Sequence, residues 1–366
     1  MEMKQSLYDK LQILEPEGVV LSDLDRLRAM ERPLLSWYKE NARVLPWRED
    51  PKPYRVWISE IMLQQTRVEA VKPYFARFME ALPDIQSLAD VSEDELLKLW
   101  EGLGYYSRAK NLKKAAELLV AQYGGNLPAS YEELKKLPGI GSYTAGAIAS
   151  IAFGIPVPAV DGNVLRVISR VTGSKEDILK QSVKASVEEK LKAVMPQDSP
   201  SSYNQGLIEI GAVVCIPNGA PLCERCPLNS PCIARAKELT GVIPVKTPKK
   251  PRKLEDKTVM LLWQDGRVAI RKREDTGLLA SLYEFPNAEG HLDETQLLLS
   301  LDIKEAKITS LPPSKHIFSH VEWYMIAYRI DLEEEPRGDY LWVTPEEIKK
   351  TYSLPGAFKA YTKLIR

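Results

Sequence analysis

The segment LKKLPGIGSYTAGAIA, residues 134–149, predicts two helices joined by a tight turn that contains Gly139 and Gly141. Glycine lets the backbone approach a partner closely, and the N-terminus of the following helix offers unpaired N–H groups to an anion. Lys135 and Lys136 lie just upstream of the turn. Because an ordinary corner between two helices would use the same residues, this segment alone leaves phosphate binding and a plain turn both open.

Helical patterns extend outward from this turn, from about residue 23 to about residue 240. Apolar residues recur at helical spacing over residues 53–82, and residues 92–103 begin with a serine cap and an acidic first turn. Residues 111–125 end on two glycines, which are common at helix C-termini. Further apolar helices are expected over residues 142–154 and 163–171.

The chain changes character after residue 240. A basic stretch with several prolines predicts a linker, and residues 257–274 predict a β-hairpin whose turn contains Asp265 and Gly266. Residues 321–334 are expected to form a strand and residues 344–355 a helix. We therefore expect an N-terminal extension (1–24), an all-helical domain (25–240), a linker (241–256) and a smaller α+β domain (257–366).

The overall charge does not indicate a class of partner, because 50 basic and 50 acidic residues give a net charge of zero. Any affinity for DNA must come from the local placement of lysine and arginine. No stretch approaches the roughly 20 apolar residues that span a bilayer. The first residues also lack the layout of a signal peptide. We expect a cytoplasmic or nucleic-acid-associated protein with no membrane partner.

The cysteines are confined to one short segment with the spacing C-x7-C-x2-C-x5-C, namely Cys215, Cys223, Cys226 and Cys232. A disulfide framework for a chain of this length would not require such a cluster. Four thiolates in one loop suit either zinc or an iron–sulfur cluster. Zinc sites usually use two close pairs, and only Cys223 and Cys226 form one here. The spacing alone does not decide between the two.

Two carboxylates are candidates for chemistry, although each also has a simple structural interpretation. On a helix Glu60 would have mostly apolar neighbours one turn away, yet a single glutamate is more often a solvated surface residue. Asp161 follows an apolar run and precedes a helix, where it could act only as an N-cap. A cap is compatible with catalysis, because it fixes a carboxylate at the start of a helix.

The segment LPWRxxxxPYxVWxSExMLQQT, residues 45–66, together with the glycine turn and the cysteines, resembles the adenine DNA glycosylases of the MutY type. The resemblance implies an all-α helix-hairpin-helix glycosylase domain, with the hairpin at 134–149 binding phosphate through Gly139 and Gly141. It also implies a [4Fe–4S] cluster on the four cysteines in the loop 215–232. The family spacing is C-x6-C-x2-C-x5-C, so this chain has one extra residue in the first gap.

The same resemblance assigns the catalytic residues. Cleaving a glycosidic bond typically needs an acid and a second carboxylate, and burial keeps the acid protonated. Glu60 corresponds to the general acid at adenine N7 and Asp161 to the group that stabilises the cationic sugar, with Tyr143 and Asn163 supporting these steps. Tyr143 stands where relatives that also cut the backbone have a Schiff-base lysine, which implies a monofunctional enzyme. Residues that match those lining the adenine pocket or wedging the opened duplex are Arg48, Leu63, Gln65, Leu103 and Tyr105.

The second domain resembles the Nudix fold, on the evidence of TGLLASLYEFP, residues 276–286. The carboxylate-rich Nudix box is missing after Pro286, so binding is expected in place of hydrolysis. Phe318, Ser319 and His320 match the loop with which adenine glycosylases recognise 8-oxoguanine opposite the target adenine.

The resemblance therefore implies a monomeric hydrolase that acts in base excision repair on duplex DNA containing A:8-oxoguanine or A:G. An endonuclease III-like glycosylase/lyase and a non-catalytic iron–sulfur protein that binds damaged DNA are the alternatives.

Overall fold

The computed structural model describes residues 21–248 and 250–365, which divide into two compact units. The first unit comprises residues 21–89 and 114–248, and the second comprises residues 90–113 and 250–365. Most of the N-terminal extension expected over residues 1–24 lies outside the described residues. Residues 90–113, which the sequence assigned to the helical domain, thus pack with the C-terminal sheet.

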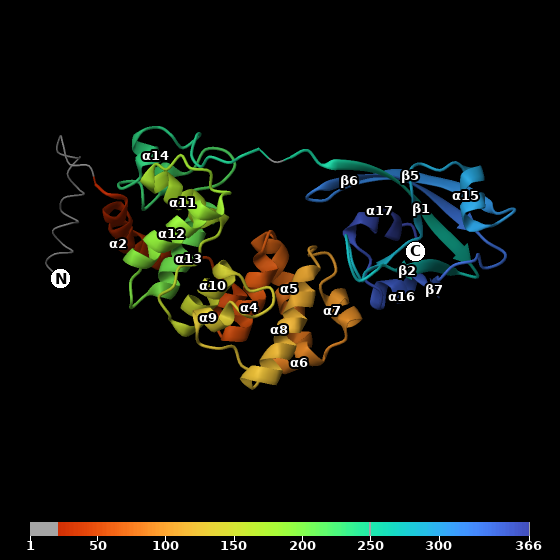
Figure 1. Cartoon of the computed structure of the whole chain (residues 1–366), viewed down its shortest axis with the longest axis horizontal. Helices are drawn as coiled ribbons and strands as arrows, with labels where there is room; N and C mark the ends of the chain where they lie inside the picture. The colour runs from red at the N-terminus through yellow and green to blue at the C-terminus, as the bar shows by residue number, and fades with distance from the viewer. Residues whose placement is uncertain (1–20, 249, 366) are drawn as a thin grey trace. The chain divides into compact units, whose positions relative to one another are not determined.

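The first unit is helical throughout, as the periodicity predicts (Figure 1). Its elements are α2 (Asp23–Asn41), α3 (Pro46–Glu49), α4 (Pro53–Leu63), α5 (Val68–Ala81), α6 (Ile85–Asp90), α8 (Ser107–Tyr123, whose first turns belong to the second unit), α9 (Tyr131–Leu134), α10 (Ser142–Phe153), α11 (Gly162–Thr172), α12 (Gln181–Val194), α13 (Pro200–Val213), η1 (Cys223–Arg225) and α14 (Ile233–Ala236).

The helix packing in the first unit brings the predicted catalytic residues to one place. Helix α10 packs on α4 and α13, and α11 packs on α13. Gly211 of α13 permits a close approach, because a Cβ atom there would lie 2.6 Å from the Cβ atom of Asn163. The periodic segment 53–82 is two helices, since residues 64–67 break it and Gln65 adopts a φ of 57°.

The second unit is built on a seven-stranded mixed sheet of order β3-β2-β1-β6-β5, in which β4 also pairs with β1 and β7 with β2. The strands are β1 (Lys253–Gln264), β2 (Arg267–Lys272), β3 (Tyr283–Glu284), β4 (Asn287–Glu289), β5 (Lys307–Ile317), β6 (Val321–Asp331) and β7 (Leu341–Val343). The predicted hairpin is present, with positive φ at both Asp265 and Gly266. Strand β1 begins within the expected linker, because Lys253 already pairs with Val321 in the parallel ladder to β6.

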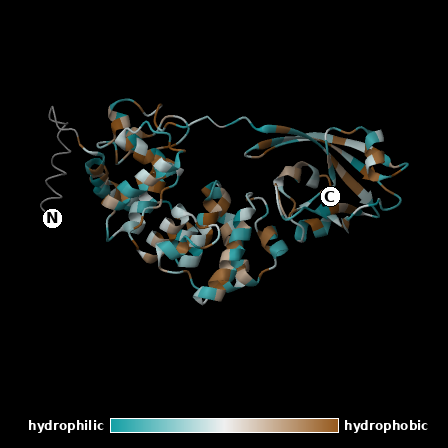
Figure 2. Ribbon diagram, in the orientation of Figure 1, coloured by the Kyte–Doolittle hydropathy of each residue, from teal (hydrophilic) through white to brown (hydrophobic). Residues whose placement is uncertain are grey.

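Short helices pack on this sheet: α15 (Glu294–Leu301) joins one apolar cluster, and α16 (Pro345–Lys350), η2 (Gly356–Phe358) and α17 (Lys359–Thr362) join the other. The second unit also contains α7 (Glu93–Leu99). Alternate residues of β1 enter two separate apolar clusters: Val259 and Leu261 join one, and Met260 and Leu262 join the other. Apolar residues recur along the helices and strands of both units (Figure 2). Within the described residues no helix has the length and apolar character needed to cross a membrane.

Candidate active site

A cavity of about 910 Å³ in the first unit is walled by α4, α13, the start of α10 and the segment before α11. It brings together most of the residues that the sequence singled out in the helical domain. Those lining it are Arg48, Glu60, Leu63, Gln65, Gly141, Tyr143, Asp161 and Asn163. Residues from four separate helical elements thus meet around one space large enough for a nucleobase.

Glu60 lies in the wall of this cavity and is only 7% exposed. The hydroxyl group of Tyr143 donates a hydrogen bond of 2.6 Å to Glu60 Oε2. Burial raises the pKa of Glu60 to about 7, the bond from Tyr143 opposes that shift, and the nearby charge of Asp161 adds to it. A solvated surface role for Glu60 is therefore wrong. A raised pKa lets this carboxyl group keep its proton closer to neutral pH than an exposed glutamate does, which is the condition for a general acid.

Asp161 is the N-cap of α11, as its place before a helix suggested. Its Oδ1 atom accepts hydrogen bonds from the backbone N–H groups of Asn163 (2.9 Å) and Val164 (2.8 Å), and its Oδ2 atom accepts one from Asn163 Nδ2 (2.7 Å). Burial raises the pKa of Asp161, while these bonds lower it in part. The cap fixes the carboxyl group at the wall of the cavity that also contains Glu60.

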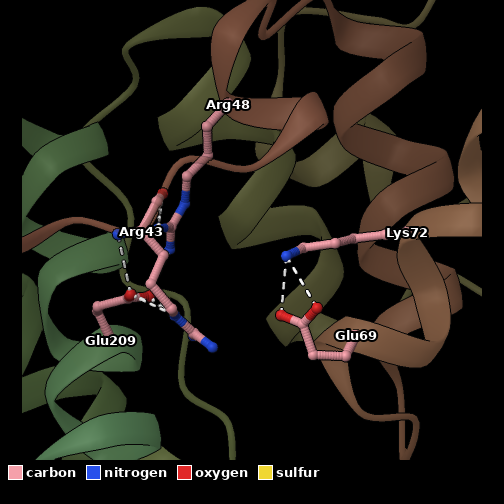
Figure 3. A network of polar contacts seen from close by, with 5 residues as sticks. All are labelled: Arg43, Arg48, Glu69, Lys72 and Glu209. Carbon is pink, nitrogen blue, oxygen red and sulfur yellow. Dashed lines mark hydrogen bonds and ion pairs between the residues drawn. The ribbon is translucent and has the colours of Figure 1, made fainter.

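Arg48 belongs to an ion-pair network that the sequence did not reveal (Figure 3). Glu209 of α13 is fully buried, and its carboxylate accepts hydrogen bonds from Arg43 Nε (2.6 Å) and Arg48 (2.8 Å). Burial alone would raise the pKa of Glu209, but the two guanidinium groups outweigh it and lower the pKa. A charged residue inside the apolar run LIEIGAVV was the one available signal. The pair Glu69–Lys72 seen nearby in Figure 3 is exposed.

The glycine turn between α9 and α10 has the backbone that its sequence predicts. Gly139 has a φ of 77°, a conformation that favours glycine, and Gly141 is the N-cap of α10 without any side-chain capping bond. Gly141 lines the cavity, whereas Gly139 does not. The two upstream lysines, Lys135 and Lys136, are each paired with a glutamate three residues earlier.

The four cysteines line one small cavity of about 30 Å³, as their spacing led us to expect. Arg170 donates a hydrogen bond of 3.1 Å to Cys215 Sγ, and Arg166 donates one of 2.8 Å to the carbonyl oxygen of Cys215. Arg166 also donates to Asn163 Oδ1 at 2.9 Å, which connects the cysteine loop to the segment that carries Asp161. The donor set of this cavity fits tetrathiolate ligation.

The remaining candidates lie in the second unit, around a separate cavity of about 810 Å³ lined by Leu103, Tyr105, Phe318, Ser319 and His320. Leu103 is 7% exposed, whereas Tyr105 is 47% exposed and has a φ of 48°. The ring of Phe318 packs edge-on against Trp323, with 4.9 Å between ring centroids. Ser319 and His320 are exposed beside it.

Comparisons with known proteins match two successive parts of the chain to two different families. Residues 58–193 match the family described as HhH-GPD superfamily base excision DNA repair protein, and residues 258–364 match the NUDIX domain family. The chain is 33% identical to adenine DNA glycosylase of Rattus norvegicus, over 90% of this chain and 77% of that protein. The chain belongs to the adenine DNA glycosylase family.

Further similarities are consistent with membership of the adenine DNA glycosylase family. The enzyme of Buchnera aphidicola subsp. Schizaphis graminum is 34% identical, over 82% of this chain and 86% of that protein. A solved non-covalent complex of endonuclease III with DNA has a TM-score of 0.51 and 26% identity, and covers 60% of this chain and 99% of that chain. The expected family and the expected pair of folds are thus confirmed. The segment after Pro286 was expected to lack the carboxylate-rich Nudix box. Helix α15, which follows Pro286, contains Glu294 as its single carboxylate.

Proposed function

We propose that this chain is a monofunctional adenine DNA glycosylase that removes adenine paired with 8-oxoguanine or guanine in duplex DNA. The observation that carries the proposal is the pair of carboxyl groups in one cavity of the first unit, the buried Glu60 and the half-buried Asp161. One is held near its titration point by burial and the other is fixed by a helix cap. This division of roles is what cleavage of a glycosidic bond requires.

The reaction begins when the adenine nucleotide is extruded from the duplex into the cavity. Glu60 gives its proton to N7 of adenine, and the glycosidic bond then breaks with its electron pair moving into the departing purine. The hydrogen bond from Tyr143 occupies Glu60 Oε2, which leaves Oε1 for the base. The Asp161 carboxylate stabilises the cationic sugar until a water adds its oxygen to C1′ and releases a proton.

Arg48 and Glu209 shape the part of the cavity that receives the base. The buried Glu209 carboxylate holds the Arg48 guanidinium in the cavity wall, and Arg48 supplies further N–H groups there. Leu63 and Gln65 line the same cavity at the break between α4 and α5. The positive φ of Gln65 marks a backbone held in an unusual conformation beside the expected path of the duplex.

Release of adenine is the only cleavage expected, because Tyr143 cannot form a Schiff base with the sugar. Its hydroxyl group is instead engaged by Glu60, so its contribution is to hold the acid. The product is an abasic site in an unbroken strand. This argues against the endonuclease III-like glycosylase/lyase alternative, although that class shares the fold of the first unit.

The four cysteines are proposed to hold a [4Fe–4S] cluster, for which the thiolate-lined cavity and the family provide the support. In the described part of the chain no three His, Cys, Asp or Glu side chains are arranged to hold a single metal ion. A cluster would keep the loop 215–232 folded, and Arg166 would connect that loop to Asn163 through its hydrogen bonds to Cys215 and Asn163.

Duplex DNA is the proposed partner, bound by a monomer. The N–H groups at the start of α10, which Gly141 leaves without a side-chain cap, and the turn at Gly139 and Gly141 would bind a phosphate without reading sequence. The cavity of the second unit would receive the base opposite adenine, with Ser319 and His320 exposed for hydrogen bonding. A protein with this substrate would act where the chromosome is, which accords with a nucleoid-associated location in a bacterium.

A single-turnover assay on a duplex containing one A:8-oxoguanine pair tests this function directly. Strand breaks that form only after alkali treatment are expected for a monofunctional glycosylase. Breaks without alkali would favour the glycosylase/lyase alternative. Tight binding to the duplex with no release of adenine would favour a non-catalytic protein that binds damaged DNA.

A further inference from the structure

The loop 274–281 of the second unit has an unusual backbone. Leu279 and Ser281 have φ values of 61° and 63°, in the left-handed region that residues other than glycine seldom adopt. Gly277, between the loop's start and these residues, also has a positive φ. A loop with two such residues needs contacts from elsewhere to keep its conformation.

Lys110, from the first turns of α8, supplies such a contact. Its Nζ atom donates a hydrogen bond of 2.5 Å to Ser281 Oγ, and the Ser281 hydroxyl group donates one of 2.7 Å to Asp275 Oδ1. Lys110 also pairs with Glu93 at 3.1 Å. Ser281 is 1% exposed, so its hydroxyl group depends on these two partners for hydrogen bonding.

These contacts lie at the cavity proposed to receive the opposite base. The loop residues 275–280 form one wall, Phe318 and Ser319 form another, and Tyr105 and Lys110 come from the segment 90–113. Lys110 thus joins the segment that carries Tyr105 to the loop that faces Ser319. The shape of the cavity depends on where the strained loop is held.

We propose that Lys110 is a positioning residue for recognition of the opposite base, acting through Ser281 and Asp275 to hold the loop 274–281 in its strained conformation. Lys110 itself need not touch DNA. Its ammonium group donates a hydrogen bond to the Ser281 hydroxyl oxygen, so the hydroxyl proton is free to donate to Asp275. The second bond connects the two ends of the loop. The inference rests on the proposed role of this cavity in reading 8-oxoguanine.

The test uses Lys110→Met and Ser281→Ala in the full-length protein. Methionine keeps an unbranched side chain but cannot donate, and alanine removes only the hydroxyl group. Single-turnover rates are measured on A:8-oxoguanine and A:G duplexes, and their ratio reports opposite-base preference. We expect the ratio to fall several-fold in each variant, because each removes a hydrogen bond that involves a charged group.

Three comparisons separate positioning from general loss of structure. The double variant Lys110→Met/Ser281→Ala should lose no more preference than either single variant, since both break one connection. Lys110→Arg should retain part of the preference because arginine can still donate. Lys114→Met is the matched control, an exposed lysine one turn later on α8, and should leave the ratio unchanged. Melting temperatures are recorded for all variants, and Ser281→Ala decides the matter if Lys110→Met does not fold.

The proposal is overturned if both single variants keep the wild-type ratio, or if their effects add in the double variant. Phe318→Ala/Ser319→Ala distinguishes these results from failure of the proposed function. If only Phe318→Ala/Ser319→Ala loses preference, the assignment of lesion reading to this cavity stands and the role of Lys110 is ruled out. A loss confined to Lys110→Met and Ser281→Ala would support the loop and remove Phe318 and Ser319 as the reading residues.

Discussion

The two cavities of this protein are held by different kinds of structure. The cavity of the first unit is walled by helices and helix ends, where caps and buried ion pairs fix Asp161 and Arg48. The cavity of the second unit is walled largely by loops, in which Tyr105, Leu279 and Ser281 all have positive φ. Helix ends suit the first cavity because they hold charged groups in fixed positions, and proton transfer tolerates little displacement of those groups.

This difference indicates which changes each cavity should tolerate. Loss of a carboxyl group in the first cavity removes chemistry that no neighbour can supply. Loss of a contact in the second cavity changes how well one opposite base is preferred over another, because specificity is a difference between two affinities. Large effects on rate are therefore expected from the first cavity and smaller effects on preference from the second.

The largest effect is expected from Glu60→Gln, which should abolish adenine release while duplex binding stays nearly intact. An amide cannot donate the proton that N7 requires, and loss of one acid–base group typically costs about 10²- to 10⁴-fold in rate. Single-turnover excision and a DNA-binding titration measure the two properties. Glu69→Gln, an exposed glutamate on α5, is the control. Retention of more than about a tenth of the wild-type rate would remove Glu60 as the acid.

Asp161→Asn should reduce excision by about 10²-fold or more, with little change in stability. Asparagine caps helices about as well as aspartate, so α11 keeps its start while the negative charge is lost. Excision rate and melting temperature are measured on the same preparations. If activity fell only in proportion to a fall in melting temperature, capping alone would account for this residue.

Tyr143→Lys should create a modest lyase activity that the wild type lacks. A lysine at this position would place an amine near the sugar C1′, and burial would help to lower its pKa. The variant should be trapped covalently by borohydride on DNA with a preformed abasic site, which bypasses adenine release. Trapping no greater than the wild-type background would mean that Tyr143 does not occupy the lyase position.

The buried carboxyl group of Glu60 should also lower the stability of the folded protein at high pH. The pKa of Glu60 is raised to about 7 in the folded protein, so the folded state binds its proton more tightly than the unfolded state does. Stability from this group is present below its unfolded pKa and is lost as the pH rises towards about 7. Glu60→Gln should therefore raise the melting temperature at pH 8 and change it little at pH 4. Equal changes at both pH values would contradict the raised pKa.

The smallest effect is expected in the second cavity. Phe318→Ala/Ser319→Ala should lower the ratio of A:8-oxoguanine to A:G excision rates several-fold and leave the A:G rate close to that of the wild type. The ring of Phe318 packs on Trp323 and directly precedes the exposed Ser319, so both substitutions act on one loop. Removing the chain after residue 240 is a poorer test, because it also strips residues 90–113 of the sheet they pack with. An unchanged ratio would argue that opposite-base reading lies elsewhere.

The sequence by itself determined the local structure of this protein. The Ser92 cap before α7, the turn at Asp265 and Gly266, and the Asp161 cap each depend on residues within a few positions along the chain. The glycine turn and the cysteine spacing were recognisable for the same reason. Helices, hairpin and family followed from such signals, because local backbone preferences are written in adjacent residues.

Only the tertiary structure decided how distant residues act on one another. Glu60 meets Tyr143 across 83 positions, Arg48 meets Glu209 across 161, and Lys110 meets Ser281 across 171. No local pattern encodes these pairs, which is why Glu209 and Lys110 were not among the predicted residues. The pKa of Glu60 is likewise a property of the folded protein, because desolvation depends on everything that packs around the carboxyl group.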